Sequence, residues 1–349
     1  MAIHPVDEIN ERYQITTGFK KRGLKKLTNN PKTSVIQFSS PLTEKEIEAL
    51  EEFVFAERPD ITLRVFGHYM DDLDLNFLKR IPSLRSFSAD SLRKTKGIEV
   101  LTGLKGLESL TIGIYELDNF DFLDGINPGL KQLSLHRTQS KKPSIDKLTR
   151  FVNLEELYLE GHFKGIASVN SLKKLKKITL RSISTPDLNY LTGLEELWSV
   201  DIKLGSIKNF DALSSLPNLK YLEMWQVRGL TDLSFVANLT ALQNLFLQSL
   251  PDVKELPNLD RLYKLRRIYL ENMKGLQKLD PLKTAPTLKD FVYVMAQNQK
   301  LENLYPVLEN ECIEAVSCGF GSSKKNEQFN NLAKKFRKKE YEYTPFIYR

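Results

Sequence analysis

The stretch LQNLFL at residues 242–247 decides the fold of this chain. An apolar residue follows at every third position from Leu250 to Leu265, and the pattern L-x-x-L-x-L then begins again with Leu265, Ile268 and Leu270. Alternation of apolar and polar residues over so short a run is typical of a strand with one buried face. Because the run recurs, the sequence predicts a protein built of repeats.

One apolar anchor position of this pattern recurs along most of the chain. Successive anchors are 24, 23, 23, 24, 21, 19, 25, 23, 23 and 23 residues apart. A period near 23 residues returns the chain to the start of the next strand, so we expect the strands to stack in parallel and each repeat to bury its apolar face on its neighbours. The anchors are Leu63, Phe87, Leu110, Leu133, Leu157, Ile178, Leu197, Leu222, Leu245, Ile268 and Phe291.

The pattern around these anchors resembles the leucine-rich repeat proteins, and among them the bacterial internalin-like class with repeats of about 22 residues. The resemblance covers roughly residues 60–295. It implies an α/β solenoid, a curved right-handed superhelix with a parallel β-sheet on the concave face. Short 3₁₀ or turn segments would form the convex face, and both ends would be capped.

The sequence departs from the family pattern in two ways. The spacing falls to 19 and rises to 25 between Ile178 and Leu222, with Ser199 at a position normally filled by leucine, so we expect irregular curvature there. In addition, the family's usual asparagine, three residues after the last strand leucine, is replaced by mostly apolar residues. These are Thr138, His162, Ile183, Ile202, Val227, Leu250 and Met273.

The amino-terminal part, residues 1–60, is predicted to cap the repeats. An apolar run at 34–38 favours a strand, and Thr43 with Glu46 forms a capping-box pattern at the start of a helix. A second strand follows at 61–65, so strand, helix and strand suggest a parallel crossover unit. A cap is needed because an open solenoid end would expose apolar core and an unpaired strand edge.

The repeats themselves are predicted over residues 61–295, with about 11 strands, and a second cap over 296–349. In that cap, residues 312–316 alternate like a final strand. Apolar residues at helical spacing predict a basic amphipathic helix over 322–339. Residues 343–348 are predicted to add a last strand.

The formal net charge is +7, and it is concentrated at the two ends. Residues 1–33 carry seven Lys or Arg and three acids, about +4, and residues 322–349 carry eight and three, about +5. The part between them is therefore near −2. These basic flanks support an alternative function, binding of nucleic acid or of another anionic surface.

The sequence also carries expectations about location. The first residues show no basic region followed by an apolar core, and no stretch approaches the ~18 apolar residues of a membrane span. Cys312 and Cys318 would lie too far apart on one extended segment to form a disulfide, and two thiols in a chain of this size fit a reducing compartment. We therefore predict a cytoplasmic protein with no membrane span.

The strand pattern predicts which residues line the concave face. The residue between the last two apolar positions points away from the core, and in the later repeats this residue is often a large aromatic. Aromatic residues and arginine dominate binding hot spots, although the rings could instead pack on one another. The predicted partner-binding residues are Tyr158, Trp198, Tyr221, Trp225, Phe246 and Tyr269, with Glu156, Arg181, Glu223 and Arg267 beside them.

Signals for catalysis or metal binding are weak. His162 is expected to be a turn residue, and Asp71, Asp72 and Asp74 lack the glycine and glutamate of a calcium loop. Neither cysteine lies in a nucleophile motif. We therefore predict no enzymatic activity, no cofactor and no metal.

The function that these patterns favour is a non-enzymatic protein-protein interaction scaffold, expected as a monomer. A macromolecular partner, an unknown protein or peptide, would bind the concave face. An inhibitor, immunity or adaptor role rests on the family resemblance alone. The nucleic-acid alternative differs in its salt dependence, because phosphate binding weakens steeply between about 50 and 200 mM salt.

Overall fold

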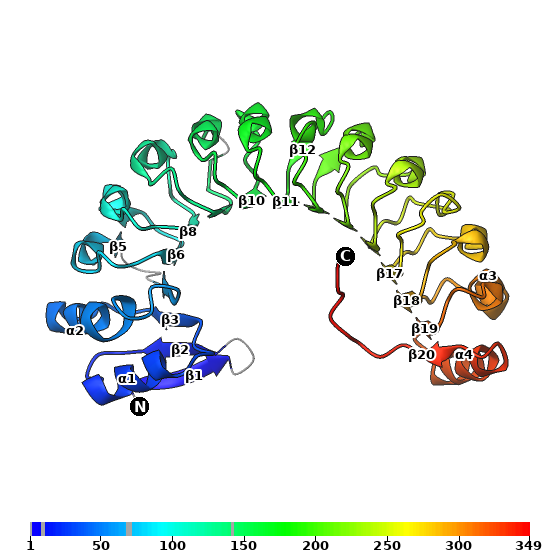
Figure 1. Ribbon diagram of the computed structural model, residues 1–349, viewed down its shortest axis with the longest axis horizontal. Coiled ribbons are helices and arrows are strands. Elements are labelled where there is room, and N and C mark those ends of the chain that lie inside the picture. Colours follow the sequence, from blue (N-terminus) through cyan, green and yellow to red (C-terminus); the bar gives the residue numbers. More distant parts are fainter. Residues whose placement is uncertain (1, 8–10, 68–71, 141–142) are drawn as a thin grey trace. The chain divides into compact units, whose positions relative to one another are not determined.

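The computed structural model describes residues 2–7, 11–67, 72–140 and 143–349. The chain divides into two compact units, Met1–Leu172 and Lys173–Arg349. Within each unit the long strands lie side by side along one face, and the short 3₁₀ segments lie along the opposite face (Figure 1). The separation of strands and 3₁₀ segments onto two faces is the arrangement expected from the predicted repeat, in which a strand alternates with a turn segment.

Among the described residues of the first unit, eight strands form one ladder, which is parallel after an opening antiparallel hairpin. In order they are β1 (Ile3–Asp7), β2 (Arg12–Ile15), β3 (Val35–Phe38), β4 (Thr62–Phe66), β6 (Ser86–Ser91), β8 (Ser109–Ile114), β9 (Gln132–Leu135) and β10 (Glu156–Glu160). Two short strands, β5 (Leu73–Asp74) and β7 (Thr95–Lys96), pair separately. The helical segments are α1 (Lys21–Asn29), α2 (Glu44–Leu50), the π-turn η1 (Glu51–Phe55), and the 3₁₀ segments η2 (Asn76–Arg80), η3 (Ile98–Gly103), η4 (Asp121–Gly125), η5 (Asp146–Arg150) and η6 (Ile166–Ser171).

The amino-terminal cap follows the predicted crossover and adds a hairpin. The side chain of Thr43 accepts the N–H of Glu46, and the Glu46 carboxylate accepts the N–H of Thr43, so the predicted capping box is formed. Strands β3 and β4 pair in parallel around helix α2. The hairpin β1–β2 was not predicted, because β1 contains a proline and exposed residues and shows no buried alternation.

Among the described residues of the second unit, eight further strands form a fully parallel ladder. They are β11 (Lys177–Arg181), β13 (Ser199–Lys203), β15 (Tyr221–Trp225), β16 (Asn244–Gln248), β17 (Arg267–Glu271), β18 (Asp290–Val294), β19 (Ala315–Cys318) and β20 (Lys339–Glu340), with β12 (Ser184–Thr185) pairing β14 (Ser206–Ile207). The helical segments are η7 (Asn189–Leu191), η8 (Asp211–Ser215), η9 (Ser234–Asn238), η10 (Asp280–Thr284), η11 (Leu301–Leu304), α3 (Tyr305–Glu309) and α4 (Ser323–Lys335).

The register of β13 corrects one predicted anchor. Ile178 pairs with Val200, and Val200 pairs with Leu222, so the repeat keeps an even spacing of 22 residues here. Leu197, the predicted anchor, is buried but precedes the strand. The prediction of 19- and 25-residue steps was therefore wrong, because an apolar residue at every third position offers two equally good starting points for the pattern.

The leucines of the repeats form the core. Those of the stretch 242–247 are fully buried, as are Leu250, Val253 and Leu259 in the turn that follows. The apolar column that replaces the family's asparagine is buried too, and includes Ile183 and Met273. With the corrected register, Gly205 and not Ile202 falls in this column, since Ile202 is a core residue of β13.

Two elements predicted near the carboxyl end have different bounds in the structure: the strand predicted at 312–316 begins later, and the helix predicted over 322–339 ends earlier, at Lys335. Strand β19 covers Ala315–Cys318, and helix α4 starts after Ser322, whose hydroxyl accepts the N–H of Lys325. The predicted last strand at 343–348 was wrong, because this segment has no strand pairing. Cys312 and Cys318 are both free thiols, and burial raises the pKa of the Cys318 thiol.

A left-handed backbone residue follows each of six strands in the second unit. Five of these residues donate their N–H to a carbonyl of the neighbouring strand or of the residue after it, so the conformation extends the ladder by one bond. A side chain in this region carries a steric cost of roughly 1–2 kcal/mol. The residues are Ser182, Leu204, Gln226, Ser249, Asn272 and Met295.

We expect Gln226→Gly to stabilise the protein. Gln226 has φ of 48°, and its side chain is exposed. Glycine removes the steric cost but adds entropy to the unfolded chain, so the net gain in unfolding free energy should be about 0.5–1 kcal/mol. Urea unfolding measures it. Gln226→Ala keeps the Cβ and is the matched control; an equal gain with alanine would contradict this explanation.

Candidate functional site

Three rows of outward-facing residues run across the strands of the second unit, and together we call them the strand face. The register of the parallel pairs places one residue of each strand in each row. The first row is Lys177, Ser199, Tyr221, Asn244, Arg267 and Asp290; the middle row is Thr179, Asp201, Glu223, Phe246, Tyr269 and Val292; the third row is Arg181, Lys203, Trp225, Gln248, Glu271 and Val294.

Aromatic side chains on the strand face are half-buried and paired. The rings of Phe246 and Tyr269 meet edge to face, with centroids 4.8 Å apart. The guanidinium of Arg181 lies 5.4 Å from the ring of Trp225, a cation–π distance. These contacts fix the orientation of the rings, so a partner would find a preorganised surface.

An acidic cluster with one lysine lies beside the aromatic rings. Lys203 Nζ lies 2.9 Å from a Glu223 carboxylate oxygen and 3.7 Å from one of Asp201, and the hydroxyl of Tyr221 donates to Glu223. Burial, with the nearby Glu223 carboxylate, raises the pKa of Asp201 to about 6. One oxygen of Asp201 is buried without a hydrogen-bond partner. Burial also raises the pKa of Tyr221.

The residues immediately before the strands add a second set of polar groups. Gln243 precedes β16 and Arg266 precedes β17, and an Arg266 N–H donates to the side-chain oxygen of Gln243 at 2.8 Å. Arg267, the first residue of β17, pairs with Asp290 at 2.9 Å. We call this border of the strand face its leading edge, formed by Trp198, Tyr221, Gln243, Asn244, Arg266 and Arg267.

The segment 341–349 of the chain lies along the leading edge. The side-chain amide of Gln243 accepts the main-chain N–H of Arg349 and donates to its backbone oxygen, at 3.0 and 2.6 Å. Arg266 donates to the carbonyl of Ile347, and Arg267 donates to the carbonyl of Thr344. Figure 1 shows this segment running from β20 along the strand side of the second unit.

Two rings of the segment contact the leading edge. Tyr348 lies 5.0 Å from the ring of Trp198 and 6.2 Å from that of Tyr221, and its hydroxyl accepts an N–H of Asn244. Phe346 lies under the guanidinium of Arg266, 4.5 Å away. Nothing in the sequence pattern pointed to this contact, because it is made through side chains and not through a strand ladder.

The predicted site residues divide between the two units. Tyr158 and Glu156 lie on β10 of the first unit, where the Tyr158 ring is 4.7 Å from His136. The remaining eight lie in the second unit. Seven of them hold positions in the three rows: Arg181, Tyr221, Glu223, Trp225, Phe246, Arg267 and Tyr269.

Trp198 requires a correction. It was predicted in the middle row, but the register places Asp201 there, and Trp198 precedes β13. The correct form of the pattern in this repeat is LWSVDI at residues 197–202. Trp198 therefore stands in the same column as Gln243 and Arg266, which moves it to the leading edge.

The predicted weak candidates for chemistry have structural roles where the structure describes them. His162 is buried, with burial lowering its pKa, and its ring packs edge to face on Phe120. Asp74 accepts the N–H of Asn76, and Asp72 lies 3.6 Å from Lys96, while Asp71 is outside the described residues. No group of three or more potential metal ligands occurs in the described part of the chain.

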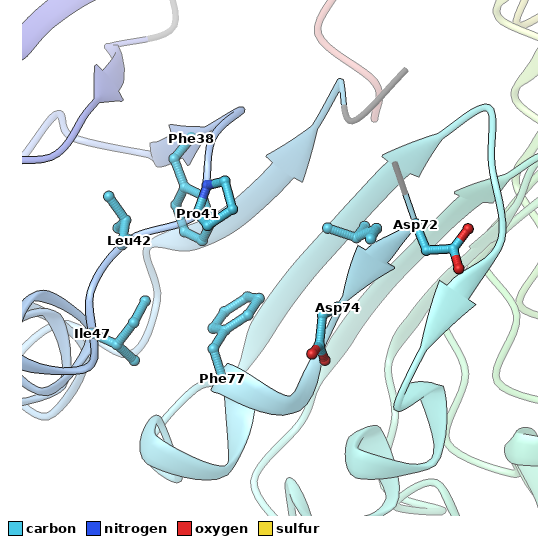
Figure 2. A pocket seen from close by; sticks show the side chains of 8 residues that line it. Phe38, Pro41, Leu42, Ile47, Asp72, Asp74 and Phe77 are labelled. Carbon is cyan, nitrogen blue, oxygen red and sulfur yellow. The ribbon is translucent and has the colours of Figure 1, made fainter. Parts of the chain in front are cut away.

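A small apolar hollow lies near these carboxylates in the first unit. It has a volume of about 290 Å³ and lies between β3, the start of α2 and η2. Figure 2 shows Phe38 and Phe77 lining it, together with Asp72 and Asp74. The rings of Phe38 and Phe77 are 5.5 Å apart, so they pack against each other in this cap.

The basic flanks are in part structural. Lys338 is buried, and its Nζ donates to the carbonyls of Asn310 and Ile313. Lys21 and Lys25 lie over the ring of Phe53. These basic side chains therefore contribute to the local packing of the flanks. Over the residues described, no helix has the length and apolar content that crossing a membrane requires.

Comparison with known proteins identifies the fold. No protein-family model matches the chain, and no curated protein matches it. An internalin (inlF) from Listeria monocytogenes is similar in structure, with a TM-score of 0.56 at 17% identity, covering 88% of this chain and 87% of that one. An LRR protein from Leptospira interrogans has a TM-score of 0.50 at 13% identity, covering 93% and 100%. With the parallel ladders described above, these likenesses confirm the predicted leucine-rich-repeat fold.

Proposed function

We propose that this chain is a non-enzymatic protein-interaction scaffold that binds a protein partner on the strand face of the second unit. The observation that carries the proposal is the gathering of Tyr221, Trp225, Phe246 and Tyr269 on adjacent parallel strands. Aromatic groups held on a rigid sheet offer a large contact area at a low cost in conformational entropy. Charged neighbours such as Arg181 would set specificity.

The charges of the strand face favour a protein over a nucleic acid. Within the three rows, four carboxylates stand among four basic side chains, so the face has no net positive field. A phosphate backbone requires such a field, whereas a protein surface presents both signs. The carboxylates are Asp201, Glu223, Glu271 and Asp290, and the basic residues are Lys177, Arg181, Lys203 and Arg267. The proposal includes a cytoplasmic location, with which the two free thiols are compatible.

We expect Trp225→Ala to reduce partner binding at least about tenfold. The ring is half-buried and contacts Arg181, while the core of β15 is formed by Leu222 and Met224, so the fold should remain. Truncation of an interface tryptophan commonly costs this much or more. The measurement is capture from a lysate of the source organism, with the captured protein then titrated in purified form at 150 mM salt.

Tyr263→Ala is the matched control. Tyr263 is 69% exposed and precedes strand β17 by four residues. Its substitution therefore removes an aromatic group that lies outside the three rows. The Tm of each variant should lie within a few degrees of the Tm of the unmodified protein. Full binding by Trp225→Ala, or a dependence on salt alone, would show that the strand face is not the binding site.

A further inference from the structure

The segment 341–349 contacts the strand face as a bound peptide would. Side chains of the leading edge bond to the main chain of Thr344, Ile347 and Arg349. Main-chain bonds of this kind do not depend on the residue types of the bound segment. The leading edge therefore holds an extended chain largely by its backbone.

Both Phe346 and Tyr348 contact side chains of the leading edge, and Tyr348 makes the more selective contact. The ring of Tyr348 lies against Trp198 and Tyr221, and Asn244 donates to its hydroxyl at 3.2 Å. Stacking with a single hydrogen bond selects an aromatic side chain with a polar tip.

The segment is held more weakly than the rest of the unit. Tyr343 is 83% exposed and Ile347 is 75% exposed, so two of its large apolar groups face solvent. After Tyr341, whose N–H donates to the carbonyl of Val316, the segment makes no backbone pairing with a strand, and side chains of the leading edge hold it. Segments with little apolar burial open at a low free-energy cost.

We infer that residues 344–349 are a built-in occupant of the leading edge, and that the partner displaces them with its own extended segment carrying a tyrosine-like aromatic residue. This inference rests on the proposed binding function of the strand face. The internal segment competes at an effective concentration of about 1 mM, as expected for a short link. With an intrinsic Kd of the internal segment on the order of 100 μM, this competition weakens the binding of any partner segment about tenfold.

The test uses the full chain and a peptide probe. The probe is the peptide YEYTPFIYR, the sequence of residues 341–349, acetylated, amidated and carrying a fluorophore. The host is the chain with Phe346→Ser and Tyr348→Ser, which removes both internal rings and leaves the leading edge intact. We expect this host to bind the probe at least tenfold more tightly than the unmodified chain, by fluorescence anisotropy.

Two controls test whether the probe binds the leading edge through its aromatic rings and its main chain. A probe carrying the same two serine substitutions should bind at least tenfold more weakly to the host. Gln243→Ala in the host should also weaken the probe several-fold, because it removes two main-chain bonds. Equal binding of both probes, or equal binding by both forms of the chain, would overturn the inference.

A measurement on the unmodified chain guards against a misfolded host. Excess probe should raise the hydrogen exchange of the Arg349 amide, whose N–H is bonded to Gln243; unchanged exchange at saturation would overturn the inference. The outcome is separable from the proposed function. If the probe does not bind as expected while Trp225→Ala still reduces partner binding, the built-in occupant is disproved and the proposed binding function stands.

Discussion

Gly205→Ala should lower the free energy of unfolding of the second unit by about 3 kcal/mol. A Cβ at this position would lie 2.0 Å from the carbonyl oxygen of Ile183 and 3.1 Å from its carbon. Both are backbone atoms, so no side-chain rotation relieves the overlap. The same oxygen accepts the N–H of Ser206, and the pairing of β12 with β14 would be disturbed.

Urea unfolding and calorimetry measure this effect. A loss of about 3 kcal/mol corresponds to a fall in Tm of roughly 6–12 °C for a unit of this size. Gly319→Ala is the matched control, because a Cβ there meets its nearest atom at 3.8 Å, an ordinary contact. A Gly205→Ala protein as stable as Gly319→Ala would show that the two neighbouring turns do not approach as closely as described.

The repeat that contains Gly205 shows which features of the fold the sequence predicts and which it does not. The 23-residue recurrence predicted the fold and ten of the eleven anchors, since leucine alternation has few structural solutions. The pattern around Leu197 failed because apolar residues three apart, Leu194 and Leu197, imitate the start of a strand. Only the pairing of Val200 with its neighbours distinguishes the two registers, and pairing is a non-local property.

For the candidate site too, the sequence predicted some positions and missed others. Row positions such as Phe246 and Tyr269 follow directly from alternation along one strand. The leading edge does not, because Gln243 and Arg266 lie outside the strands and show no periodic signal of their own. Their contact with residues 344–349 joins parts of the chain 77 to 106 residues apart. A local pattern cannot contain such a contact.

Asp201→Asn should stabilise the protein at pH 7.5 by up to about 3 kcal/mol and have little effect near pH 4. The folded pKa of Asp201 is raised to about 6, by burial and then by Glu223, while an unfolded aspartate titrates near 3.9. Between these values the folded state binds more protons than the unfolded state. The contribution of Asp201 to stability is therefore present below pH 4 and is lost as the pH rises through 6.

The measurement is urea unfolding of both proteins from pH 4 to pH 8, compared at each pH. The asparagine amide is neutral throughout, so the difference between the two proteins should grow with pH and level off above 7. Lys203 keeps Glu223 as a partner at 2.9 Å, and no cation is left alone by the change. Asp252→Asn, in an exposed turn, controls for the loss of one negative charge. A difference that is as large at pH 4 as at pH 7.5 would mean that Asp201 remains ionised in the folded protein, and that Lys203 neutralises both Asp201 and Glu223.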